Sequence, residues 1–213
     1  MQAIERIITD NNWITLVIIF AIVLLAIMKL LKPNKLRDYS LAFFTTGFFK
    51  RKVEDNTSFF SPFYIIFFFF STITISLLLF LILLPSAYLP SFFNYIILCC
   101  FVSIYFILKN LLDFILANII ESNYNTKYFL ATKSGYLNSL SLWLFPGIII
   151  YQYAFKSHIF LLIFSVILFV FRAFLVLINN KKIVIRKLFY FILYFCTLEI
   201  APLIIVYKIT TTT

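Results

Sequence analysis

The sequence predicts an all-α, polytopic transmembrane helix bundle, and three observations lead to this fold class. Hydrophobic residues make up 63% of the 213-residue chain and charged residues only 12%, whereas a water-soluble domain is about half apolar and a quarter charged. The apolar residues form unbroken runs of about 20 residues, which is typical of membrane-spanning helices and not of alternating barrel strands. Glycine is scarce, at 3 residues, which excludes collagen-like and linker-rich chains.

Six apolar runs are expected to cross the membrane and to form one integral membrane domain over residues 1–213. At about 1.5 Å per residue, each run is long enough to cover a hydrocarbon core about 30 Å thick. Pro62 opens the second run, where proline suits a first helical turn. The six predicted membrane-spanning helices cover residues 13–31, 62–84, 95–120, 136–155, 159–178 and 188–207.

The basic residues predict how the bundle is oriented. The loops at 32–61, 121–135 and 179–187 hold twelve Lys and Arg residues, against three on the opposite side. Loops rich in Lys and Arg stay in the cytoplasm, so both termini are expected on the non-cytoplasmic side. The net charge of +10 is therefore interpreted as a topology signal, and no nucleic-acid partner is expected.

The first of these loops, residues 32–61, is the longest polar stretch of the chain. Its middle part, 36–52, mixes Phe with basic ends and predicts a short helix lying in the membrane interface. A docking surface for another protein is the alternative interpretation. The basic residues of this cytoplasmic loop are Lys32, Lys35, Arg37, Lys50, Arg51 and Lys52.

Four ionisable residues lie well inside the predicted helices: Lys109, Asp113, Arg172 and Glu199. Lys109 and Asp113 are four residues apart and share one helix face. The helical rise places Lys109, Arg172 and Glu199 at similar depth. An unpaired charge near the bilayer centre costs at least about 2.5–3.5 kcal/mol, so we expect one buried charge network that joins the third, fifth and sixth helices. Three roles fit this network: an interhelical clamp, a proton or ion relay, and contact with a partner subunit.

Prolines predict breaks in two of the helices. Pro146, followed by Gly147, frees the carbonyl of Leu142 in the fourth helix, and Pro202 frees that of Leu198 in the sixth. Such breaks line binding sites in transporters, but they are also ordinary kinks in membrane bundles. Both interpretations remain open.

Residue types that carry catalysis or bind metal are poorly supplied. His158 is the only histidine, and Cys99, Cys100 and Cys196 all lie inside apolar runs without CxxC or zinc-type spacing. The chain shows no Gly-rich phosphate loop and no nucleophile–base pair. We therefore expect no enzyme activity, no cofactor and no metal.

Five stretches give the chain a resemblance to a family of bacterial inner-membrane proteins of unknown function, found mainly in the Bacteroidota. They are NNW at 11–13, AFFTTGFFKRK at 42–52, LKNLLDFILANII at 108–120, SLWLFPGIII at 141–150 and FRAFLVLI at 171–178. The resemblance covers nearly the whole chain. It implies a compact helical membrane domain and supplies no catalytic residue.

These observations predict a non-enzymatic, multi-pass subunit or assembly factor of a bacterial inner-membrane complex, with the cell envelope or the secretion machinery as candidate settings. The expected partners are membrane lipids and other membrane protein subunits. A small transporter or channel that uses the buried charge network for proton or ion coupling is the alternative function. A third hypothesis is a lipid-handling protein with a specific lipid retained between the third, fourth and sixth helices.

Overall fold

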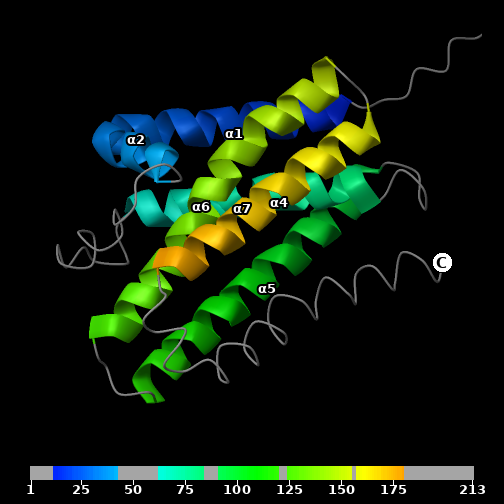
Figure 1. Ribbon diagram of the computed structural model, residues 1–213. Helices are drawn as coiled ribbons and strands as arrows, with labels where there is room; N and C mark the ends of the chain where they lie inside the picture. Colours follow the sequence, from blue (N-terminus) through cyan, green and yellow to red (C-terminus); the bar gives the residue numbers. More distant parts are fainter. Residues whose placement is uncertain (1–11, 43–61, 84–90, 120–123, 155–156, 180–213) are drawn as a thin grey trace, which may run out of the picture.

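The computed structural model describes residues 12–42, 62–83, 91–119, 124–154 and 157–179, apart from the side chains of residues 83, 113–133, 177 and 179. The regular structure in these ranges is entirely α-helical, which confirms the all-α fold class (Figure 1). The helices are α1 (Asn12–Leu31), α2 (Pro33–Leu41), α4 (Pro62–Leu83), α5 (Phe92–Ile119), α6 (Tyr124–Tyr153) and α7 (His158–Asn179).

Four of these helices are long and apolar enough to cross a membrane, which supports a membrane location. Their candidate spans are Asn12–Leu31, Pro62–Ile82, Phe92–Leu112 and His158–Val176. The sixth predicted helix, residues 188–207, lies outside the described residues. Six crossings and the side on which each terminus lies therefore stay predictions.

Helix α4 lies at the centre of the described bundle. It packs against α1, α5 and α6, and 61% of its span is buried, compared with 17–28% for the spans of α1, α5 and α7. A helix that is apolar on all sides is expected to be buried on all sides, and the α4 sequence is of this kind. Phe63, Phe67 and Phe70 form a fully buried stripe along it.

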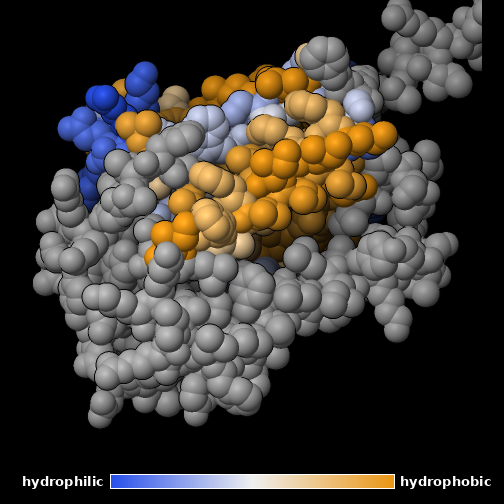
Figure 2. All heavy atoms as spheres, viewed as in Figure 1, coloured by the Kyte–Doolittle hydropathy of each residue, from blue (hydrophilic) through white to orange (hydrophobic). Residues whose placement is uncertain are grey.

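Apolar side chains also cover the outside of the bundle. Figure 2 shows hydrophobic residues across α7, whereas hydrophilic residues gather at the end of the molecule where α2 lies. On α5 an exposed stripe recurs every three or four residues. It consists of Phe93, Ile97, Phe101, Ile104, Leu108 and Leu111. Apolar patches of this extent mark membrane or protein contact.

Helix α6 differs from the prediction in where it starts. The sequence predicts a loop at 121–135, but α6 begins at Tyr124 and runs for 30 residues. Lys, Asn and Thr lower the stability of a helix by less than about 1 kcal/mol per residue relative to Ala. The polar stretch therefore marks where the apolar run begins, and the helix itself starts earlier. The helix also continues through Pro146 and Gly147, so neither residue ends it. Pro202 lies outside the described residues.

Helix α2 is the described part of the basic first loop. Pro33 stands in its first turn, where the missing N–H of proline costs nothing. Exposed polar residues lie on one side of α2, while Tyr39 is almost fully buried on the other. The Tyr39 ring meets the Phe67 ring of α4 edge-on, with centroids 5.0 Å apart. This burial holds α2 on the bundle.

Candidate functional site

Small polar side chains join α4 to α6. The Ser71 hydroxyl on α4 lies 2.8 Å from the Ser141 hydroxyl on α6 and donates to Asn138 Oδ1 at 3.2 Å. Both serines are buried. Helices in membranes associate through small residues that let their backbones approach and through hydrogen bonds between helices. This pair of serines therefore fixes the register of α4 on α6.

Two further hydroxyl groups of α4 donate to its own backbone. Thr74 donates to the carbonyl of Phe70 at 2.8 Å and Ser76 to that of Ile73 at 2.9 Å. The Ser76 hydroxyl also lies 3.3 Å from the Tyr95 hydroxyl of α5. Buried hydroxyl groups of α4 thus reach both α5 and α6, while Thr74 and Ser76 also bond within their own helix.

Helix α6 also holds α2 by two hydrogen bonds. The Ser139 hydroxyl donates to the main-chain carbonyl of Tyr39 at 2.7 Å, and the Trp143 indole N–H donates to that of Ser40 at 3.1 Å. Ser139 and Trp143 are four residues apart on one face of α6. Both carbonyls lie in the last turn of α2, where the helix itself leaves carbonyls without intrahelical partners. The Tyr39 carbonyl also accepts from the Ala42 N–H at 3.3 Å, just beyond the helix end. The basic first loop therefore begins as a fixed helix.

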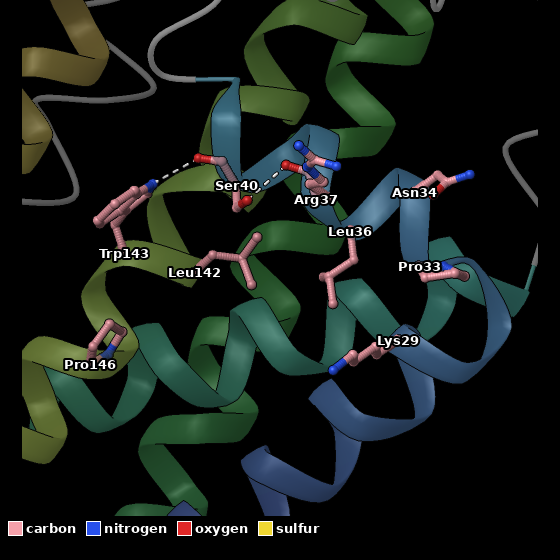
Figure 3. A pocket seen from close by; sticks show the side chains of 9 residues that line it. All are labelled: Lys29, Pro33, Asn34, Leu36, Arg37, Ser40, Leu142, Trp143 and Pro146. Carbon is pink, nitrogen blue, oxygen red and sulfur yellow. Dashed lines mark hydrogen bonds between the residues drawn. The ribbon is translucent and has the colours of Figure 1, made fainter.

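A groove opens beside this junction (Figure 3). It encloses about 570 Å³ between the end of α1, helix α2 and the middle of α6. Lys29 reaches in from α1 on one side, and Arg37, Ser40 and Trp143 stand on the opposite side. The lining residues are Lys29, Pro33, Asn34, Leu36, Arg37, Ser40, Leu142, Trp143 and Pro146.

Two members of the predicted charge network lie in the bundle interior. Lys109 on α5 and Arg172 on α7 are each only 7% exposed, and the Lys109 ammonium lies 5.8 Å from the centre of the Tyr105 ring. The backbone of Asp113 belongs to α5, but its side chain and Glu199 lie outside the described residues. Two buried cations call for nearby acceptors, so the network itself stays a prediction.

The predicted third and fifth helices correspond to α5 and α7. Helix α7 packs mainly on α6, and α5 packs mainly on α4. The sixth predicted helix falls outside the described ranges. The packing of the third, fifth and sixth helices around one network therefore stays a prediction.

Comparison with known proteins decides the family. Residues 14–210 match the family described as a domain of unknown function, DUF4271. The chain belongs to the DUF4271 family. The match covers nearly the whole chain, and it confirms the resemblance to a family of unknown function; the bacterial source and the inner membrane stay expectations. No curated protein and no solved structure shows significant similarity to this chain.

The basic loop of this DUF4271 chain is described in part. Lys32 and Arg37 are exposed, whereas Lys35 is half-buried with its ammonium 5.8 Å from the centre of the Tyr64 ring. Lys50, Arg51 and Lys52 lie outside the described residues. The face of α2 that carries Tyr39 is buried against the bundle. Lys32 and Arg37 are therefore the α2 cations that a partner or a membrane surface can reach.

Catalytic and metal-binding groups are sparse in the described part of the DUF4271 chain. Across those residues, no three His, Cys, Asp or Glu side chains lie close enough to share a metal ion. His158 contacts the Tyr151 hydroxyl, with Nδ1 at 3.1 Å. Cys99 and Cys100 are free thiols.

Sequence reasoning missed the serine contacts and the groove. Ser71, Ser139 and Ser141 stand inside apolar runs, and a hydropathy average hides them. The signal that could have found them is the short polar cluster in each of two helices, STITIS at 71–76 and NSLS at 138–141. Facing polar clusters in two membrane helices indicate contact between them.

Proposed function

We propose that the protein is a non-enzymatic integral membrane subunit or assembly factor of a bacterial inner-membrane complex, with α2 as part of its docking surface. The observation that supports this function most directly is the attachment of α2 to α6. Two hydrogen bonds and the buried Tyr39 ring hold this polar helix against the bundle.

Such an attachment suits a docking surface because a partner that meets a fixed helix does not have to order it. Ordering a flexible segment on binding consumes part of the interaction energy. The exposed cations of α2, Lys32 and Arg37, suit an acidic partner surface, which they would attract and orient. In this proposal the apolar outer faces of α5 and α7 contact lipid or the transmembrane helices of the same complex.

The test is affinity purification of the tagged full-length protein from its native membrane in mild detergent, with identification of every stoichiometric partner. The variant Ser139→Ala combined with Trp143→Phe removes both donors to α2. We expect this variant to retain its helical content and to lose the partner. Ser103→Ala is the matched control, because that hydroxyl bonds only to the Cys99 carbonyl of its own helix.

Two results would contradict the proposal. One is a strictly monomeric protein, shown by native mass measurement, with no co-purifying partner. The other is a partner retained equally by the double variant and by Ser103→Ala, which would place the docking surface away from α2.

A second function, a small transporter or channel, is favoured by a different observation. Lys109 and Arg172 are buried in membrane-spanning helices, and charged groups in such places mark ion and proton pathways as well as structural pairs. Proteoliposomes should then show proton or solute flux that falls in Glu199→Gln and in Lys109→Gln. If neither the unmodified protein nor the two variants shows flux, the transporter function is contradicted and the buried charges have a purely structural role.

A further inference from the structure

We propose that the groove between α1, α2 and α6 binds the headgroup of an anionic phospholipid. The first reason is the distribution of polarity along its walls. Lys29, Asn34 and Arg37 supply charged and polar groups, whereas Leu36, Leu142 and Pro146 supply apolar surface. A phospholipid offers both kinds of partner, a charged phosphate and the apolar start of its acyl chains.

The second reason is uncompensated positive charge. Lys29 and Arg37 are exposed and come from different helices, and no acidic residue is among the described residues that line the groove. In the described part of the chain, neither cation forms an ion pair. Arginine presents paired N–H donors to phosphate oxygens, and lysine extends its ammonium along apolar surface to reach a headgroup. The two side chains thus supply positive charge to the groove from two of its walls.

The third reason is the position of the groove along the membrane-spanning helices. Thr15, near the start of α1, accepts a hydrogen bond from the Tyr153 hydroxyl at the end of α6. Lys29 lies fourteen residues further along α1, or about 21 Å at the helical rise, in the last turn of that span. The groove thus lies toward the opposite membrane interface, the level at which phospholipid headgroups are found.

This position selects a lipid over the other anions with the same chemistry. Free phosphate gains nothing from Leu36, Leu142 and Pro146, whereas an acyl chain covers them. The hydrogen bonds from Ser139 and Trp143 keep α2 in place, so the groove exists before its ligand arrives. The inference is independent of the proposed function, because a lone membrane protein could hold such a lipid equally well.

The test uses the fluorescence of Trp143, which lines the groove. The chain has 2 tryptophans, and Trp13→Phe leaves Trp143 as the only one. The full-length variant is reconstituted into phosphatidylcholine vesicles that contain either brominated phosphatidylglycerol or, as the reference, brominated phosphatidylcholine. Bromine quenches tryptophan on contact. We expect the anionic lipid to quench Trp143 at a much lower mole fraction than the neutral one.

The decisive variants remove equal charge from two places. Lys29→Gln with Arg37→Gln takes both cations from the groove, whereas Lys32→Gln with Lys35→Gln takes two from α2 residues that do not line it. Each basic side chain near an anionic lipid raises affinity by a factor of about five. The groove variant should therefore lower the preference for phosphatidylglycerol about 25-fold, and the control variant should largely keep it. Circular dichroism and an unfolding titration confirm that both variants fold.

Three results would overturn the proposal. Equal quenching by the two lipids in the unmodified groove would show that no anionic headgroup is selected. An equal loss in both double variants would show a diffuse charge effect and no built site. Competition by inorganic phosphate, or by polyglutamate, that removes the preference would identify a free anion or an acidic protein segment as the occupant.

Discussion

The α4–α6 contact and the outer face of α5 are both made by apolar helices, but they differ in what their side chains do. On α4, a stretch with two serines lies between large buried rings, and Ser71 meets Ser141 across the interface. On α5, the exposed stripe is made of large residues such as Phe101, which is 77% exposed. Lipid is as apolar as either surface, so apolarity alone does not drive two membrane helices together. The comparison shows that small residues and hydrogen bonds decide which apolar faces pair.

Replacing a phenylalanine by alanine should change the free energy of unfolding very differently in the two regions. Phe67 is fully buried and its ring meets Tyr39, so Phe67→Ala leaves a cavity and should lower the free energy of unfolding by about 3–5 kcal/mol. Phe101→Ala removes an exposed ring and should change it little. Unfolding titrations in mixed detergent micelles measure both. Similar losses at the two positions would mean that the α5 face is itself packed.

A leucine in the serine contact should have the next largest effect. Ser71→Leu forces a larger side chain between α4 and α6 and removes the bond to Ser141, with an expected cost of about 1–3 kcal/mol. Ser103→Leu on α5 is the control, because Ser103 bonds only within its own helix. The same titration reports the difference. If Ser103→Leu loses more stability than Ser71→Leu, the contact between Ser71 and Ser141 does not hold α4 and α6 together.

Gly147 allows a close approach between α6 and α7. A Cβ atom built at this position overlaps the ring of Phe164 on α7, so Gly147→Ala should cost about 1–2 kcal/mol through local overpacking. The loss should be partly recovered by adding Phe164→Leu, because the smaller side chain can yield. Thermal unfolding of the single and double variants tests this coupling, and additive losses would contradict it.

The smallest expected effect belongs to the attachment of α2. Ser139→Ala removes one hydrogen bond to the Tyr39 carbonyl, and such bonds contribute about 0.6 kcal/mol on average in a membrane. Ser165→Ala, at an equally buried position, removes a bond to the Leu162 carbonyl of its own helix and should cost less. Hydrogen exchange of the α2 amides gives a local readout: it should rise for Ser139→Ala alone.

The helices and their membrane character could be predicted from the sequence, because bilayer thickness imposes the length of an apolar run. The start of α6 could not be predicted, because Lys127 and Lys133 lie before the apolar run but already inside the helix. The groove could not be predicted either. Its walls come from three helices, and Lys29, Arg37 and Trp143 line one groove only after α2 has folded back onto α6.

The candidate charge site shows what sequence reasoning can reach. The cost of a charge in hydrocarbon predicts burial for Lys109 and Arg172, and both side chains are buried. The cost of a buried charge does not predict which helices pack next to Lys109 and Arg172. Helix packing depends on contacts between helices, such as that of Ser71 with Ser141. Glu199 and the side chain of Asp113, the expected acceptors, lie outside the described residues.

The length of α6 exceeds what the hydrocarbon core requires. Thirty residues make a helix of about 45 Å, whereas the core is about 30 Å thick. Ser139 and Trp143 attach α2 to the middle of this long helix. As long as both bonds hold, any movement of α6 would carry the basic side chains of α2 with it.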